Sequence, residues 1–166
     1  MFFNIQKVSF TNSLLIQKTL DTLFFLKQDY PQFRLWYKTK VISGLENNSR
    51  QIYIATPDNN PDCIAAVMIL KNDGNEKKIS TLCVLDQYRS LGLGSRLMHL
   101  AIEVLNSPKP IITVSDTHMN EFEPLLKKFG FEHFHTYPGY YKDKISEHTY
   151  NGYLNSNAVN NNTKAS

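Results

Sequence analysis

The sequence predicts a single α/β domain with a mixed sheet, and three observations support that class. Apolar strand-like runs alternate with amphipathic helical runs through the middle of the chain, in the order strand, helix, strand, helix, strand. A pair of helical segments and a hairpin precede them, and the turn of the hairpin is carried by Asn72–Asn75. With 166 residues, 42% of them hydrophobic, the chain can build one ordinary core.

The first third of the chain is expected to contain a strand, two helical segments and a second strand. Gly44 is expected to stop the second helical segment. Apolar residues recur at helical spacing in the first segment and predict one buried stripe, formed by Ile16, Leu20, Leu23 and Phe24. The expected elements are a strand at 2–10, a helix capped by Asn12 or Ser13, a helical segment at 32–43 and a strand at 51–56.

The rest of the domain is expected to continue with the hairpin, two helices and three strands. The run 63–70 is almost entirely apolar, which predicts a strand covered on both faces. Gly130 suits a left-handed cap at the end of the last helix. The expected elements are strands at 63–70 and 78–85, a helix at 95–105, a strand at 111–114, a helix at 121–129, and strands at 132–137 and 148–154 joined through Pro138 and Gly139.

Composition narrows the class of partner. The net charge of +3 is too small to indicate nucleic acid or a membrane surface, and the pairs Lys77-Lys78 and Lys127-Lys128 are interpreted as solvated faces. The sequence shows no signal peptide, no apolar run near the ~20 residues of a bilayer span, and no disulfide framework. We therefore expect a soluble cytoplasmic domain over residues 1–154, followed by a disordered Asn-rich tail over 155–166.

The segment from Arg89 to Ser95 predicts a backbone cradle for a phosphate. It follows an apolar strand and opens a helix, whose free N–H groups and dipole attract negative charge. Gly92 and Gly94 carry no Cβ, so a diphosphate can approach the main chain closely, and Ser95 can cap the helix. The spacing fits neither the P-loop, which needs Gly-Lys-Ser/Thr, nor the dinucleotide fingerprint, because Leu97 stands where its third glycine belongs.

In this context the run Val84–Leu97 resembles the core motif of the GNAT superfamily of N-acetyltransferases. Two weaker elements, Lys127–Phe131 and Gly139–Lys142, extend the resemblance over about residues 24–154. The resemblance implies a mostly antiparallel central sheet flanked by helices, with a splayed strand pair that holds acetyl-CoA as the acyl donor and no metal.

Site residues follow from the resemblance by position. Leu82, Cys83 and Val84 match the strand whose backbone pairs with the pantetheine arm, and their amides could hold the thioester oxygen as charge develops on it. Asn120 matches an asparagine that lies beside the pantetheine. The pyrophosphate loop is matched by Arg89, Ser90, Leu91, Gly92, Leu93, Gly94 and Ser95.

The acid and base are not settled by the resemblance. The family's usual glutamate positions hold Lys78 and Thr113 here, and its usual tyrosine position holds Leu126. We expect Tyr141 or Tyr140 to supply the acid. Candidate bases, beside water-relayed deprotonation, are Glu76, Asp116, His118 and Glu147. His133 and His135 are interpreted as solvent-facing residues rather than as half of a metal site, and Cys83 as a core residue rather than a nucleophile.

The resulting hypothesis is an acetyl-CoA-dependent N-acetyltransferase in which a primary amine attacks the thioester directly. The alternative is a non-catalytic acyl-CoA-binding regulatory module. It is motivated by Lys78, Thr113 and Leu126, which stand where the family usually has its glutamates and its tyrosine. The expected partner is a small-molecule or peptide amine and not a membrane. An amine carried on tRNA and a homodimer both stay open.

Overall fold

The structure is a computed structural model that describes residues 1–154. Within these residues, seven strands form one sheet in the order β1-β2-β3-β4-β5-β7-β6. The strands β4 and β5 pair in parallel, and every other neighbouring pair is antiparallel. The strand bounds are β1 Phe3–Lys7, β2 Arg50–Pro57, β3 Ala66–Asn72, β4 Lys77–Val84, β5 Ile111–Ser115, β6 His133–Lys142 and β7 Ile145–Tyr150.

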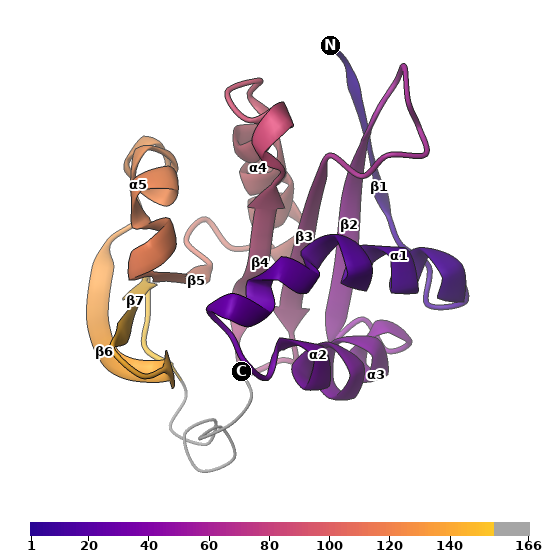
Figure 1. Cartoon of the computed structure of the whole chain (residues 1–166). Coiled ribbons are helices and arrows are strands. Elements are labelled where there is room, and N and C mark those ends of the chain that lie inside the picture. Colours follow the sequence, from indigo (N-terminus) through magenta and orange to yellow (C-terminus); the bar gives the residue numbers. More distant parts are fainter. Residues whose placement is uncertain (155–166) are drawn as a thin grey trace.

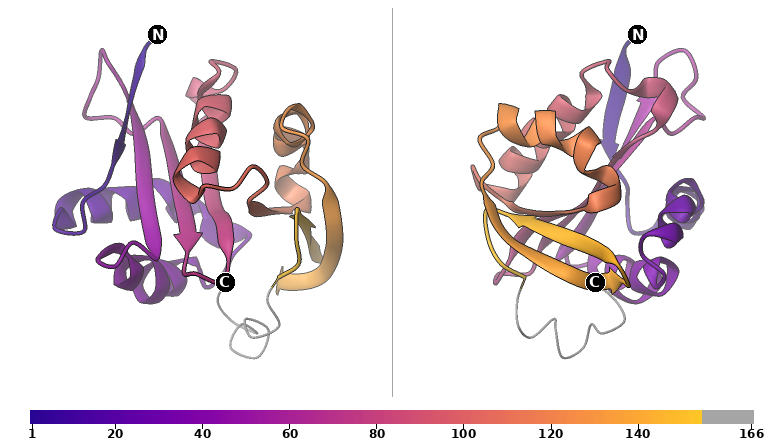
Figure 2. Two further views of the ribbon diagram at one scale, coloured as in Figure 1. Left: turned by 180° about the vertical axis from the view of Figure 1, so that it is seen from behind. Right: turned by 60° about the vertical axis from the view of Figure 1, so that its left-hand side comes forward.

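Helices cover both faces of the sheet, as Figures 1 and 2 show. The helices α1 (Ser13–Leu23), α2 (Phe33–Trp36) and α3 (Ile42–Leu45) pack on one face, and α4 (Leu93–Leu105) and α5 (Met119–Lys128) pack on the other. Short 3₁₀ or π turns join them at Phe24–Gln28, Tyr37–Val41, Asp86–Tyr88 and Asp116–His118. The expected mixed, mostly antiparallel sheet flanked by helices is confirmed, and no helix among residues 1–154 has the length and apolar character needed to cross a membrane.

The strands β4 and β5 separate soon after they meet. Their pairing covers Lys78 with Ile111 and Ile79 with Ile112, and then ends. On the other edge of β4, Thr81 pairs with Ile69 while Ile79 pairs with Leu70, so Ser80 is an extra, bulged residue at the same point. Figure 1 shows β5, β6 and β7 standing apart from β4 beyond this point. The sheet is therefore split into two parts that share only a short contact.

Local signals placed several element ends correctly. The Asn12 side chain accepts a hydrogen bond from the Leu15 N–H at 3.0 Å and caps α1. The Asn72–Asn75 turn joins β3 to β4, and Gly130 takes φ +65° after α5. These features depend on a few neighbouring residues, which is why the sequence was sufficient to predict them.

Other expected boundaries were wrong. The strand expected at 63–70 begins at Ala66, because the preceding turn continues to Cys63, whose N–H donates to the Asn60 carbonyl at 3.1 Å. Pro138 and Gly139 do not join two strands, since they lie in a bulged stretch of the edge strand β6. The chain reverses instead at residues 143–144, where Lys144 has φ +64°. An edge strand tolerates Pro138 because it needs no N–H on its open side.

Gly44 does not stop the second helical segment, which continues through it to Leu45. A Cβ at Gly44 would lie 2.5 Å from Arg50 Cγ and 2.9 Å from Arg50 Cβ. This glycine is therefore required by packing, because it makes room for the Arg50 side chain at the start of β2.

We predict that Gly44→Ala destabilises the protein by about 1–3 kcal/mol, because the added methyl overpacks against Arg50 near its own backbone. Gly94→Ala is the matched control, since a Cβ there meets nothing closer than Leu125 Cδ2 at 3.8 Å. The control should leave stability unchanged or raise it by up to about 1 kcal/mol through helix propensity. Urea unfolding of both variants measures the difference, and equal midpoints would contradict this account of Gly44.

Candidate functional site

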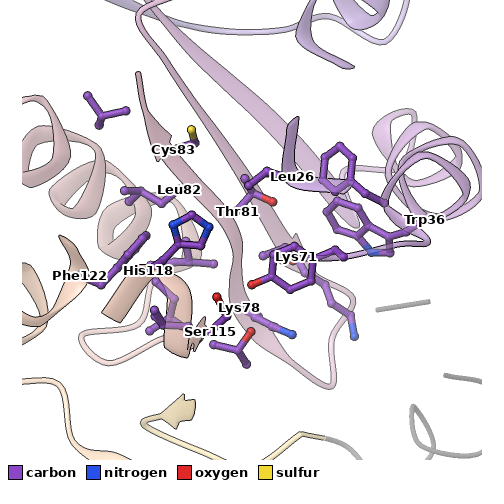
Figure 3. A pocket seen from close by; sticks show the side chains of 18 of the residues that line it. Leu26, Trp36, Lys71, Lys78, Thr81, Leu82, Cys83, Ser115, His118 and Phe122 are labelled. Carbon is purple, nitrogen blue, oxygen red and sulfur yellow. The ribbon is translucent and has the colours of Figure 1, made fainter. Parts of the chain in front are cut away.

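A cavity of about 1150 Å³ follows the gap between β4 and β5. One end lies at the loop before α4 and the first turn of that helix, where Gly92 and Ser95 line it. The other end lies at α2 and the tip of β6, where Trp36 and Tyr140 line it. Figure 3 shows Trp36 on one side of the cavity and His118 and Phe122 on the other, with Leu82 of β4 beside His118 and Thr81 toward Trp36.

The loop before α4 presents main-chain N–H groups to the cavity. Gly92 caps α4 with φ +78°, and Ser90 before it takes φ +62°, a conformation that a non-glycine residue adopts at a cost. Beyond the adjoining backbone, a Cβ at Gly92 would meet no atom within 4 Å. The open space and the exposed N-terminus of a helix together suit an anion.

Protein packing alone does not explain the second glycine of this loop. Gly94 lies inside α4, and a Cβ there would make only an ordinary contact with Leu125. Because Gly94 also lines the cavity, the missing side chain leaves the first turn of α4 accessible to a ligand.

The polar side chains of this loop differ from expectation. Ser95 does not cap α4, because Gly92 takes the cap position and Ser95 lies in the first turn. The Ser95 hydroxyl instead accepts a hydrogen bond from Lys128 Nζ at 3.0 Å. Lys128, interpreted above as part of a solvated pair, therefore brings a positive charge to this end of the cavity, whereas Lys127 pairs with Glu123 at 2.9 Å on the surface.

The guanidinium of Arg89 is already engaged. It contacts Asp86 and Glu121 at 2.8 Å each, and Nε donates to the Val84 carbonyl at 3.3 Å. Arg89 lines the cavity, but these contacts tie the loop to β4 and α5 rather than leaving a free fork for a phosphate.

The free edge of β4 faces the gap. The Leu85 N–H donates to Ala65 on the β3 side at 2.9 Å, and successive strand residues direct their N–H groups to opposite edges. The N–H groups of Leu82 and Val84 therefore point toward the gap, while Cys83 pairs with Val67 of β3. Extended backbone with unpaired groups can bind an extended ligand by strand-like hydrogen bonds.

Two predicted site residues lie away from the cavity. Leu91 is 48% exposed at the tip of the loop, and Asn120 is exposed in α5; neither is among the cavity-lining residues. Asn120 differs from expectation because α5 begins at Met119, two residues before the expected start at Glu121. Asn120 is consequently part of the helix rather than of the loop that leads into it.

Of the four candidate bases, Glu147 has the most unusual environment. It is 2% exposed on β7, opposite Ser115 of β5. Burial raises the pKa of its carboxyl to about 7. Its Oε1 accepts a hydrogen bond from the Tyr30 hydroxyl at 3.3 Å, and Tyr30 lines the cavity. A carboxylate with a pKa near neutrality and a hydroxyl link to the cavity has the properties of a general base.

The other three candidates are held by partners. Asp116 is exposed and bonds the His148 ring and the Ser146 N–H, and the His148 hydrogen bond is the main cause that lowers its pKa. His118 contacts Asp29 at 2.9 Å. Glu76 pairs with Lys71 at 3.0 Å. Of these three, Glu76 and His118 line the cavity and Asp116 does not.

Three further residues, Lys78, Thr113 and Leu126, stand where the resemblance implies two glutamates and a tyrosine. Lys78 is buried, and burial lowers the pKa of its amine, although the charges of Glu76 and Glu147 act in the opposite direction. Thr113 and Lys78 both line the cavity. Leu126 is 2% exposed within the core, so this position offers no hydroxyl.

Both tyrosines predicted to supply the acid line the cavity. The Tyr140 hydroxyl is buried, and among residues 1–154 it has no hydrogen-bond partner. The Tyr141 ring packs against Tyr30 and Tyr140, with ring centroids 5.3 and 4.6 Å apart. Burial raises the pKa of Tyr140, so its hydroxyl keeps its proton near neutral pH.

The remaining candidate groups have ordinary surroundings. Burial raises the pKa of the Cys83 thiol to about 11, which disfavours a nucleophilic thiolate. A bulge separates His133 from His135 on β6, and His133 bonds Thr136 at 3.0 Å. Across the described part of the chain, no three His, Cys, Asp or Glu side chains gather closely enough to hold a metal ion.

A sequence profile of the acetyltransferase (GNAT) family matches residues 13–131. The chain belongs to the GNAT acetyltransferase family. A comparison with curated proteins finds no significant match. Solved structures similar to this GNAT acetyltransferase share its fold at low sequence identity.

Three of these structures illustrate the likeness. An acetyltransferase assigned to the GNAT family, from Desulfovibrio desulfuricans, superposes with a TM-score of 0.66 at 11% identity, over 90% of this chain and 97% of its own. An aminoglycoside 6′-N-acetyltransferase complexed with coenzyme A gives 0.61 at 14% identity, over 89% and 94%. The PaiA N-acetyltransferase of Thermoplasma acidophilum, in complex with coenzyme A, gives 0.59 at 15%, over 90% and 98%.

The cavity residues of this GNAT acetyltransferase that sequence reasoning missed include Tyr30, Trp36, Arg50 and Lys128. Three of them precede the loop motif by at least 39 residues in the sequence, so no local pattern connects them to it. The sequence does hold a signal that distinguishes Lys128 from Lys127. Residues four apart on a helix are neighbours, so Lys127 lies beside Glu123, whereas Lys128 lies on another face of α5.

Proposed function

We propose that this chain transfers the acetyl group of acetyl-CoA to a primary amine, which attacks the thioester directly inside the cavity. The observation that carries the proposal is the continuity of the cavity through the β4–β5 gap, from the start of α4 to Trp36. A donor bound at one end and an acceptor bound at the other can then meet between the strands. The neighbours that bind coenzyme A or carry an amine-acetylating name support the same chemistry.

For the donor, we assign the diphosphate to the main-chain N–H groups of residues 92–95, with Lys128 as the nearby cation. We assign the pantetheine arm to the free edge of β4 at Leu82, Cys83 and Val84. Amides that face the gap would also stabilise the oxygen of the tetrahedral intermediate, where negative charge develops. Arg89 and Ser90 would hold the shape of the loop, and Leu91 and Asn120 would make no contact.

For the acceptor, we assign proton removal to Glu147 acting through Tyr30. The amine nitrogen attacks the carbonyl carbon and acquires a positive charge, so one proton must leave it. Tyr30 can accept that proton on its hydroxyl oxygen while donating its own proton to Glu147 Oε1, 3.3 Å away. Burial strongly raises the Tyr30 pKa, with the Glu147 charge acting in the same direction, so Tyr30 relays a proton and does not ionise itself.

When the C–S bond breaks, the leaving thiolate needs a hydrogen-bond donor or a proton. We assign this role to Tyr140 in preference to Tyr141, because the buried Tyr140 hydroxyl has no partner among the described residues. Both remain the candidates that the sequence indicated.

The direct test combines calorimetry with a turnover assay. We expect acetyl-CoA to bind at micromolar to millimolar concentrations and free thiol to be released when primary amines are supplied. Absence of binding at millimolar acetyl-CoA would refute the proposal. Binding without acetyl transfer to amine, peptide or tRNA-linked acceptors would instead support a non-catalytic acyl-CoA-binding module.

We predict that Gly94→Ala weakens the binding of coenzyme A by about tenfold or more, and that Gly94→Glu abolishes it. The added Cβ occupies the approach of the diphosphate, and the carboxylate adds repulsion. Gly94 is preferred to Gly92 for this test, because Gly92 has φ +78° and any side chain there also strains the backbone. Unchanged affinity in a folded Gly94→Glu variant would contradict the assigned diphosphate site.

We predict that Glu147→Gln lowers kcat by about 100-fold or more, which is the usual range for loss of a general base. In the unaltered protein, activity should fall as pH decreases through about 7, because protonation removes the accepting carboxylate. The variant should lose this step near neutrality and keep only the rise toward the amine's own pKa near ~10. The groups whose charges or hydrogen bonds also shift the pKa of this carboxyl are Tyr30, Lys78, Asp29 and Thr113.

Asp116→Asn is the matched control, since Asp116 is exposed and lies outside the cavity lining. It should keep the pH profile and most of the activity. Equal losses in both variants, or a Glu147→Gln profile that still shows the step near neutral pH, would contradict the role of Glu147.

We predict that Tyr140→Phe lowers kcat by about tenfold to 100-fold with little change in coenzyme affinity. Tyr141→Phe, which keeps the ring packing, should have a smaller effect. Steady-state kinetics of the two variants side by side measures the contrast, and a larger loss in Tyr141→Phe would transfer the role to Tyr141.

A further inference from the structure

The acceptor end of the cavity contains a buried donor that has no partner in the described part of the chain. Trp36 is 5% exposed and lines the cavity. Among residues 1–154, its indole Nε1 is buried without a hydrogen-bond partner. Burying an N–H group without a partner is costly, so a hydrogen-bond acceptor that reaches Nε1 would remove this cost.

A guanidinium lies beside the same ring. Arg50 lines the cavity and is half-buried, and its guanidinium carbon stands 5.8 Å from the centroid of the Trp36 ring. One nitrogen, Nη1, donates to the Ser80 hydroxyl at 3.1 Å. Because a guanidinium carries five N–H donors, most of its hydrogen-bonding capacity is left over.

No carboxylate of the described residues lies within 4 Å of this guanidinium. The carboxylates whose charges act on Arg50 are those of Glu76 and Asp73. Both are bound to Lys71, at 3.0 and 3.2 Å. A half-buried arginine without an ion-pair partner, next to an unpartnered indole N–H, forms a site that attracts an anionic oxygen group.

The fold holds Arg50 in this position from three directions. Gly44 leaves room for its Cβ and Cγ, Trp36 stacks on its charged end, and Ser80 accepts its hydrogen bond. Ser80 is the bulged residue of β4, at the point where β4 and β5 begin to separate. The guanidinium therefore lies where the gap between β4 and β5 begins, on the face of the sheet that α2 covers.

We propose that the acceptor is a small primary amine that also carries a carboxylate, and that Arg50 and Trp36 bind this carboxylate. Arginine can engage a carboxylate with two parallel N–H donors, and the Trp36 Nε1–H can add a third. The carboxylate would fix one end of the acceptor while its amine faces the thioester. The inference rests on the proposed acetyl transfer and adds the class of acceptor, an amino acid or short peptide.

Acetyl transfer to paired acceptors tests the inference. The panel consists of α-amino acids, ω-amino acids and dipeptides, each matched with the amide that replaces its carboxylate. We expect the carboxylates to be preferred. In Arg50→Gln, the KM for carboxylates should rise about 10–100-fold, the usual value of a charged hydrogen bond. The KM for amides and the Kd for acetyl-CoA should stay unchanged.

A second variant keeps the inference testable if Arg50→Gln does not fold. Trp36→Phe keeps an aromatic ring, although a smaller one, and removes the N–H donor, so it should raise the KM for carboxylates about threefold to tenfold relative to the KM for amides. Equal losses on carboxylates and amides in both variants, or a preference for amines without a carboxylate, would overturn the inference.

A binding measurement separates this inference from the proposed function. Trp36 is the only tryptophan in the chain, so intrinsic fluorescence reports on this site directly. In the presence of coenzyme A, N-acetylglycine should change the Trp36 emission and N-acetylglycinamide should not, and Arg50→Gln should lose the response. An equal response to both probes overturns the carboxylate site alone, whereas failure to bind acetyl-CoA overturns the proposed function.

Discussion

The structure depends on the early separation of β4 and β5. A parallel pair normally continues its hydrogen bonds along the full length of both strands, and each unpaired buried group is costly. Here the pairing ends after Ile79 and Ile112, beside the bulge at Ser80. The exposed strand edge and the cavity both follow from this break. In the proposed function, the pantetheine arm supplies the missing hydrogen-bond partner of the free edge.

Burial gives the groups around this gap their chemical character. Glu147 and Lys78 lie on strands from the two parts of the sheet, and desolvation shifts both pKa values toward neutrality, upward for the carboxyl and downward for the amine. Neither group is unusual as a residue type. Burial among the strands raises the pKa of Glu147 to about 7, and this effect outweighs the hydrogen bonds from Thr113 and Tyr30, which lower it. A pKa near the working pH suits proton transfer.

Sequence reasoning located those parts of the cavity lining that have a local signal. The loop at residues 89–95 carries its own signal, because glycine at Gly92 reflects a positive φ and the following residues start a helix. It did not choose among four acidic or histidine candidates, because their burial is set by strands far apart in the chain. The role of Gly44 was not predictable for the same reason, because the side chain that needs its space is Arg50, in a later strand. The expected tail over 155–166 lies outside the described residues.

The central claim is that donor and acceptor meet in the gap between β4 and β5. A crystal structure with coenzyme A and an N-acetylated amino acid tests it most directly. We expect the diphosphate on the N–H groups of residues 92–95, the pantetheine along Leu82 and Val84, and the product carboxylate on Arg50. A coenzyme bound on another face, or strands that close the gap by pairing along their length, would contradict it.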